Sequence, residues 1–358
     1  MSLSVVLPGL TAALALVFAI ALLDQWRDRR HSFQLVWSLG MLFYAVAAGC
    51  EALAALGSWN EVLYRTWYLT GAVWTAGWLG LGTAFLLART RFGYTFGFLM
   101  LLGGLIMFAL RNNPAYGDAG SAPVLYFMVA VVIALAIGLQ TYFNEALWPR
   151  VAAIGVVGAT VLSIVLSVTT SLPAPGYMVD QSSGVPLPDL LPASLRLLTP
   201  FLNITGGLAL ALGALFSAYV FMPKRRVLPY SLDPNQPGDQ FLFNLFIAPV
   251  AILVNFVVSL PGALRTLATG RIHSRVPSTL LIAIGAFFPT VTDSLSRAGA
   301  PEWRSLGHLM GVLFLFGGFL VSIEVFREIR VPFTRIVLRT GRRERGAGDT
   351  MAGIGDAG

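Results

Sequence analysis

Two carboxylates in apolar surroundings are the first candidates for chemistry in this sequence. Glu51 falls near the end of one long apolar run and Asp293 near the end of another. An ionisable side chain inside a membrane is costly, so it generally marks a ligand site, an ion path or an ion pair. Glu51 is therefore interpreted either as a protonatable or ligand-binding group, or as one half of a structural ion pair.

The predicted partner of Glu51 is Arg65. A turn at Gly57 and Ser58 lies midway between them, so an antiparallel helical hairpin places both residues at the same depth. An ion pair there would hold the hairpin together. Arg65 also lies four residues after Glu61, and a pair at i, i+4 on one helix would leave Glu51 without this partner.

Asp293 and Asn203 are the other polar candidates, and each follows a proline within an apolar run. Asp293 can pair with Arg297 at i, i+4 spacing. Asn203 needs a partner inside the bundle, because lipid offers no hydrogen bond. Helices interrupted at prolines build the substrate sites of many transporters. The region 241–300 therefore carries a transport alternative.

An aromatic face is expected along the apolar run 64–89. At about 100° per residue, Trp67, Trp74 and Trp78 fall on one side of a helix. Trp67 fits an interfacial aromatic belt. Trp74 and Trp78 lie deeper, and they either fill the bundle interior or line a pocket for a flat, apolar ligand. The opposite face is a row of small residues that permits close helix packing: Ala72, Ala76, Gly80 and Ala84.

The elements that position these residues are membrane-spanning helices. Of 358 residues, 56% are hydrophobic and 11% are charged, and the mean hydropathy is +0.75. Soluble domains carry about 25% charged residues. Apolar runs of about 20 residues recur along the chain, which predicts an all-α integral membrane protein, a polytopic helical bundle. Seven N-terminal spans are expected roughly at 4–23, 33–56, 65–88, 93–110, 123–142, 151–171 and 198–221.

Basic residues set the expected orientation. The odd-numbered connections and the segment after the seventh span are the basic ones, so the positive-inside rule places the N-terminus outside. These connections hold Arg27, Arg29, Arg30, Arg89, Arg91, Arg150, Lys224, Arg225 and Arg226. The C-terminal tail is also rich in arginine, and keeping it in the cytoplasm requires an odd number of spans. We therefore predict that 278–292 and 306–326 cross and that 241–260 is re-entrant or interfacial.

Four segments follow from this topology. A seven-helix bundle is expected over 1–222, a cytoplasmic linker over 223–240, and a C-terminal membrane module with proline-broken segments over 241–326. The basic cytoplasmic tail, 327–358, is predicted to bind anionic lipid headgroups and to be disordered at its end.

The scarcity of cysteine, histidine and lysine argues against several classes of function. The lone cysteine, Cys50, excludes an internal disulfide and a cysteine metal cluster. The histidines lie far apart, so no metal site and no bis-histidine haem is expected. The sole lysine, Lys224, follows the seventh span, where it cannot form a mid-membrane Schiff base with retinal. Catalytic motifs are not found. No cofactor is expected, and a non-enzymatic role is favoured.

The topology is similar to that of bacterial seven-helix sensory modules. The sequence predicts a bacterial cytoplasmic-membrane protein of receptor-like, ligand-binding or accessory-subunit type. Its outward-facing aromatic pocket would lie between the second, third and seventh spans, with the loop 172–196 either capping it or serving as a passive connector. The expected partners are the lipid bilayer and a separate membrane or cytoplasmic protein, and no nucleic acid. The alternatives are a small transporter and an enzyme acting on a lipid-soluble substrate.

Overall fold

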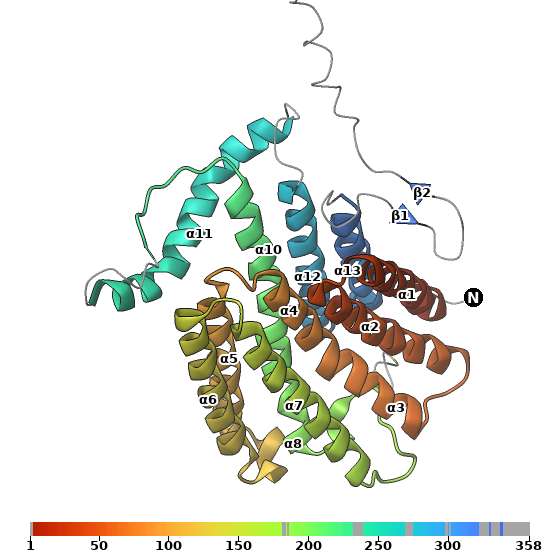
Figure 1. Ribbon diagram of the computed structural model, residues 1–358. Helices are drawn as coiled ribbons and strands as arrows, with labels where there is room; N and C mark the ends of the chain where they lie inside the picture. Colours follow the sequence, from red (N-terminus) through yellow and green to blue (C-terminus); the bar gives the residue numbers. More distant parts are fainter. Residues whose placement is uncertain are drawn as a thin grey trace, which may run out of the picture.

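Long helices make up nearly all of the ordered structure (Figure 1). The computed structural model describes residues 3–180, 184, 186–231, 239–268, 275–297, 300, 302–321, 329–330 and 337–338. The α-helices are α1 (Leu3–Arg29), α2 (Ser32–Leu56), α3 (Glu61–Trp67), α4 (Thr75–Leu86), α5 (Phe92–Ala109), α6 (Ala122–Phe143), α7 (Trp148–Thr169), α8 (Ala193–Arg196), α9 (Leu198–Leu202), α10 (Leu208–Phe221), α11 (Asp239–Ala268), α12 (Arg275–Arg297) and α13 (Glu302–Val321).

Two π-helical turns and a few short elements complete the fold. The π turn η1 (Tyr68–Trp74) joins α3 to α4, and η5 (Asn203–Gly207) joins α9 to α10. Short 3-10 turns are η2 (Leu110–Asn112), η3 (Pro114–Ala119) and η4 (Pro188–Leu190). The two-residue strands β1 (Ile329–Arg330) and β2 (Val337–Leu338) pair antiparallel. The rest of the tail 327–358, on which the lipid-binding prediction falls, lies outside the described residues.

Within the described residues, nine helices are long and apolar enough to cross a membrane. They are α1, α2, the continuous stretch Glu61–Leu86, Phe92–Asn112, α6, α7, Ala193–Phe221, Arg275–Asp293 and Trp303–Val321. Helix α11 contributes only a shorter apolar stretch, Val250–Thr266. The expected fold class, an all-α membrane bundle, is confirmed.

The outer surface of the bundle is apolar where it would face lipid. On α6, Leu125, Val132 and Leu139 follow at seven-residue spacing, and each is exposed. A soluble monomer rarely exposes an apolar stripe of this length. Proline at the first helical turn of α6 and of α7 starts each helix at no cost, because the first backbone N–H groups have no intrahelical partner.

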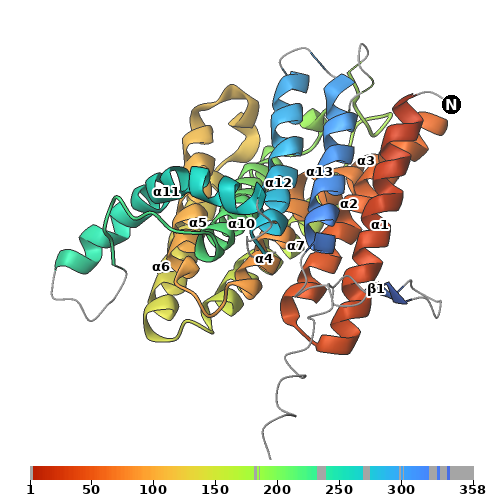
Figure 2. The ribbon, with the colours of Figure 1, turned by 90° about the horizontal axis from the view of Figure 1, so that it is seen from above.

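The C-terminal helices share a core with the N-terminal ones. Helices α12 and α13 form an antiparallel pair that packs on α1, α2 and α10 (Figures 1 and 2). The Phe18 ring lies 4.9 Å from the rings of both Phe316 and Phe319, and Phe319 meets Trp37 edge-on at 4.7 Å. Residues far apart in sequence are thereby brought to the junction between α2 and α13.

The small face of the third span packs as predicted. A Cβ atom added to Gly80 would lie 2.7 Å from the carbonyl carbon of Gly206, and one added to Gly206 would lie 2.6 Å from the Cα of Gly77. Real Cβ atoms do not approach backbone so closely, so the third and seventh spans cross in direct backbone contact. This close crossing is confirmed for Ala76 and Gly80, which lie beside Gly206.

Prolines do not interrupt the C-terminal helices. Helix α11 contains Pro249 and Pro261, α12 contains Pro289, and each helix continues through them. Within the described residues 241–268 and 275–297, the expected proline-broken segments are therefore continuous helices. Helix α11 crosses the end of α10 and projects sideways from the bundle (Figures 1 and 2).

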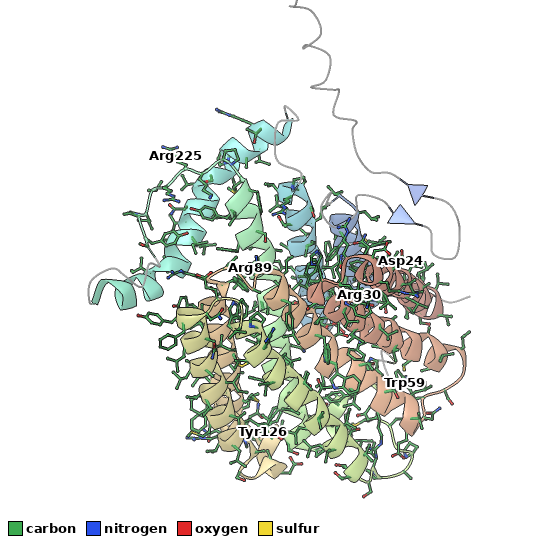
Figure 3. The ribbon with its side chains drawn as sticks, viewed as in Figure 1. Asp24, Arg30, Trp59, Arg89, Tyr126 and Arg225 are labelled. Carbon is green, nitrogen blue, oxygen red and sulfur yellow. The ribbon has the colours of Figure 1, made fainter. Side chains whose placement is uncertain are left out.

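Figure 3 labels residues at both ends of the bundle. Arg30, Arg89 and Arg225 lie toward one end, and Trp59 and Tyr126 lie toward the other. We refer to these as the basic end and the Trp59 end.

Candidate functional site

A cluster of four ionisable side chains joins α2 to the C-terminal helix pair near the Trp59 end. It consists of Glu51 from α2, Asp293 from α12, and Arg304 and His308 from α13. The Nη2 atom of Arg304 lies 2.7 Å from Glu51 Oε1, and its Nε atom lies 3.5 Å from Asp293 Oδ1. The Nε2 atom of His308 lies 3.0 Å from the same Asp293 oxygen. We call these four residues the acid–base cluster.

Two aromatic side chains border the acid–base cluster. Trp67 donates its indole N–H to Glu51 Oε1 at 2.7 Å, and its ring lies 5.9 Å from the Arg304 guanidinium carbon. Tyr44 donates its hydroxyl to the backbone carbonyl of His308 at 3.1 Å. The carboxylate of Glu51 is thus held by one cation and one neutral donor, which compensates for its burial.

Exposure differs within the acid–base cluster. The side chains of Glu51 and Arg304 are 12% and 14% exposed, whereas that of Asp293 is 40% exposed. The two carboxylates of Glu51 and Asp293 face the single guanidinium of Arg304. Within the described part of the chain, no three side chains of His, Cys, Asp or Glu are arranged to hold a metal ion. The arrangement is suited to binding a polar or charged ligand.

Close packing of the α12–α13 hairpin assembles one side of the cluster. A Cβ atom on Gly307 would clash with the side chain of Thr292, and one on Gly285 would lie 2.7 Å from the backbone nitrogen of Leu315. These glycines let the two helix backbones approach closely. Asp293 is thereby brought within reach of Arg304 and His308, which lie about one turn apart on α13.

Arg65 does not pair with Glu51, so that prediction was wrong. Its Nη2 atom lies 2.6 Å from Glu61 Oε1, which confirms the i, i+4 alternative. Arg65 also donates to the carbonyl oxygens of Ser167 and Thr170, at the C-terminus of α7. The hairpin argument placed Arg65 near the depth of Glu51, but it did not predict the side of the helix from which the Arg65 side chain projects. Positions 65 and 67 point about 200° apart on a helix, and position 67 is the one that faces Glu51.

Asn203 does not lie inside the bundle, contrary to prediction. Its side chain is exposed, because the inward face of this span is taken by Phe201, Leu202 and Thr205. Asp293 pairs with Arg304 and His308 on the neighbouring helix, and the side chain of Arg297, its predicted partner, lies outside the described part of the structure.

Trp74 and Trp78 pack between α2 and α7. Trp74 donates to the Ser163 hydroxyl at 2.8 Å and Trp78 to that of Thr160 at 3.1 Å. Both rings meet Phe43 of α2 edge-on, at 5.0 and 5.7 Å. These contacts favour the packing interpretation over a ligand wall. They also place both indoles against the sixth span, not the seventh as the predicted pocket required.

The π turn η1 divides the predicted aromatic stripe. An i→i+5 turn inserts one extra residue, so residues before and after it no longer share the face that a uniform helix would give them. Trp67 therefore faces Glu51, while Trp74 faces α7. Trp67 is buried, as is the neighbouring Tyr68, which contradicts the assignment of Trp67 to an interfacial belt.

The loop 172–196 packs onto the Trp59 end of the bundle. Tyr64 donates its hydroxyl to the carbonyl of Leu187, and the loop residues Leu191 and Leu195 are buried. Arg196 bonds to the carbonyl of Ala115 at 2.6 Å and so ties the loop to a second connection. The described part of the loop is a packed cover over the third span.

Sequence reasoning missed Arg304, His308 and Tyr44. A signal for Arg304 was present: positions 293 and 304 are symmetric about the turn between α12 and α13, as positions 51 and 67 are about the turn after α2. The hairpin rule that placed Glu51 opposite the third span would also have placed Asp293 opposite Arg304. His308 was set aside because it stands alone in sequence, although α13 brings it one turn below Arg304.

Replacing Trp67 with phenylalanine is expected to destabilise the protein more than replacing Trp78 with phenylalanine. Both changes keep a ring and remove one N–H donor. A hydrogen bond to a charged acceptor contributes about 1.5–3 kcal/mol, whereas a neutral one between membrane helices averages about 0.6 kcal/mol. Thermal denaturation of the two purified variants in the same detergent measures the difference. Equal losses would contradict the charge-assisted bond from Trp67 to Glu51.

Comparison with known proteins adds no assignment to this geometry. The chain matches no protein-family model, and no curated protein and no solved structure is similar to it at a significant level.

Proposed function

We propose that this protein is a receptor-like membrane protein that binds a small cationic ligand at the acid–base cluster. The observation that carries the proposal is the placement of two carboxylates around one guanidinium, with Asp293 40% exposed and Glu51 only 12% exposed. Ionisable groups inside a membrane bundle are costly and generally functional. The two carboxylates and the nearby rings of Trp67 and Tyr44 suit a cation.

The ligand would act where two parts of the chain meet. Glu51 and Arg304 are separated by 253 positions in sequence and belong to the helices that join the N-terminal bundle to the α12–α13 pair. A cation that competes with Arg304 for a carboxylate would weaken this link, and a signal could pass to α12 and α13. We propose that a separate membrane or cytoplasmic protein receives it, in the accessory-subunit role that the sequence suggested.

The same proposal includes a location and an orientation. A bacterial cytoplasmic membrane, with the Trp59 end outside and the basic end in the cytoplasm, agrees with the distribution of Arg30, Arg89 and Arg225 (Figure 3). The acid–base cluster would then be reached from outside. The transport alternative depended on interrupted helices in 241–300, and its support is weaker because α11 and α12 are continuous.

Small cations are expected to raise the melting temperature of the purified protein. A panel of primary, quaternary and polyvalent amines would be compared with matched carboxylates and sugars. A ligand at 100 times its Kd stabilises by about 2.7 kcal/mol. The shift should disappear in Asp293→Asn and Glu51→Gln. It should persist in Glu61→Gln, because that carboxylate pairs with Arg65 away from the cluster.

Two outcomes would refute this function. If carboxylates stabilise the protein and amines do not, the sign of the ligand charge is wrong. If an amine shift survives both Asp293→Asn and Glu51→Gln, the ligand binds elsewhere and the acid–base cluster is structural.

A further inference from the structure

Helix α11 is amphipathic in the reverse sense to a helix on a soluble protein. Its inner face is small or polar and is buried: Ala251, Asn255, Ser259 and Ala263. Its outer face is large and apolar, and each of its residues is 54–60% exposed: Val250, Leu253, Val257 and Leu264. At about 100° per residue, the two sets fall on opposite sides of the helix.

The inner face of α11 binds the linker that follows the seventh span. The side-chain carbonyl of Asn255 accepts from the backbone N–H groups of Val227 and Leu228 at 2.8 and 2.9 Å, and its amide donates to the carbonyl of Leu228 at 2.8 Å. The Ser259 hydroxyl accepts from the N–H of Arg225 at 2.8 Å. Asn255 has no exposed surface. These four hydrogen bonds hold the linker along α11.

The linker that is held on the inner face carries exposed basic side chains. Lys224, Arg225 and Arg226 are exposed, and Arg265 is exposed near the C-terminal end of α11. This region belongs to the basic end of the bundle, where Figure 3 shows Arg225. Packing of Ala263 against Tyr219 and Val276 attaches α11 to the ends of α10 and α12.

The occupant of the outer face must be apolar and bordered by negative charge. Exposure of this face to water is unfavourable, because four large apolar side chains would remain solvated. A second copy of this chain docked through the same apolar face would cover Val250, Leu253, Val257 and Leu264 but would bring no negative charge to Lys224, Arg225 and Arg226. A bilayer with anionic headgroups supplies both acyl chains and negative charge.

We propose that α11 lies in the plane of the membrane at the basic end, with Val250, Leu253, Val257 and Leu264 among the acyl chains. Lys224, Arg225, Arg226 and Arg265 bind the headgroups of anionic lipids. This surface is independent of the acid–base cluster, which lies near the other end of α12.

Site-directed spin labelling tests the placement of the outer face. Cys50 is the sole cysteine, so a Cys50→Ser chain accepts a single label at Val257→Cys or, as the matched control, at Arg226→Cys. The full-length protein would be reconstituted in phosphatidylcholine vesicles with and without phosphatidylglycerol. Oxygen concentrates among acyl chains and a nickel chelate stays in water. The oxygen-to-nickel collision ratio is expected to be on the order of tenfold higher at position 257 than at 226.

Each other outcome for this label overturns the placement. A label at position 257 that collides freely with the nickel chelate lies in water. A label that is immobilised and shielded from both reagents is covered by protein, as a second copy of the chain would cover it. The fraction of each variant that elutes as a single species in gel filtration shows whether the labelled chain has folded.

The charge component has its own measurement. The preference of the protein for spin-labelled phosphatidylglycerol over phosphatidylcholine is expected to fall by up to about fivefold for each arginine removed in Arg225→Gln and Arg226→Gln. The backbone bond from Arg225 to Ser259 is kept in both variants. The matched control is Arg111→Gln, which removes an exposed arginine from another connection and should leave the preference unchanged. An unchanged preference in the first two variants would overturn the anionic-headgroup assignment.

Discussion

Replacing Arg304 with methionine is expected to destabilise the folded protein by about 3–5 kcal/mol, because removing one partner leaves a buried charge without compensation. Glu51 is 12% exposed and would keep only its hydrogen bond from Trp67. Asp293 would lose its contact with the Arg304 Nε atom. Methionine retains much of the aliphatic volume, so the loss reports on charge. Chemical or thermal denaturation of the purified protein in one detergent measures it.

Two further variants show whether the loss of stability in Arg304→Met comes from breaking the Glu51–Arg304 ion pair. Glu51→Gln combined with Arg304→Met removes both charges and is expected to recover much of the stability, since replacing a buried pair with neutral groups is often tolerated. The exposed pair provides the comparison. Glu61→Gln breaks the bond to Arg65, where the Glu61 side chain is 47% exposed, and should cost less than about 1 kcal/mol. If Arg304→Met costs no more than Glu61→Gln, Glu51 does not depend on Arg304.

Replacing Gly206 with alanine is expected to separate the third and seventh spans. The added Cβ atom would lie 2.5 Å from the carbonyl carbon of Ala76 and 2.6 Å from the Cα of Gly77. Both are backbone atoms, and they move only if a whole helix moves. Overpacking a tight core costs about 1–3 kcal/mol, and a contact with rigid backbone belongs at the upper end of that range. The melting temperature and the monodisperse fraction in gel filtration would both fall.

The same substitution elsewhere should have the opposite sign. Gly158 lies in α7 and has no atom within 4 Å of an added Cβ. Alanine is favoured over glycine in a helix interior by roughly 0.5–1 kcal/mol, so Gly158→Ala is expected to stabilise slightly. A loss of stability in both variants would mean that any glycine-to-alanine change destabilises this bundle, and that the Gly80–Gly206 crossing does not control the result.

These two regions explain how the acid–base cluster is built. The Gly80–Gly206 crossing holds the third span against the seventh, and the α12–α13 pair packs on α1 and α2. Glu51 lies on α2, between these two assemblies. A change in the Glu51–Arg304 bond would therefore alter the packing of the α12–α13 pair against the rest of the bundle.

Much of the architecture was determined by the sequence alone. Apolar runs of membrane-spanning length, ended by arginines and prolines, gave the helices that the structure contains, because a backbone in lipid must satisfy its own hydrogen bonds. The positions of the hairpin turns predicted which residues of neighbouring helices lie at the same depth in the membrane. Glu51 lies opposite the start of the third span, where it contacts Trp67. The row of small residues predicted a close crossing, and Gly80 makes it.

Which side chains meet was decided by the tertiary structure. In a soluble helix the apolar face identifies the inside, but in a membrane helix every face is apolar, so the pattern does not show which neighbour a face will meet. That is why Arg65 was assigned to Glu51 and Asn203 to the interior. The π turn η1 rotated Trp67 away from Trp74, which no uniform period anticipates. The Glu51–Arg304 pair spans 253 positions, and only the packing of α13 beside α2 brings it together.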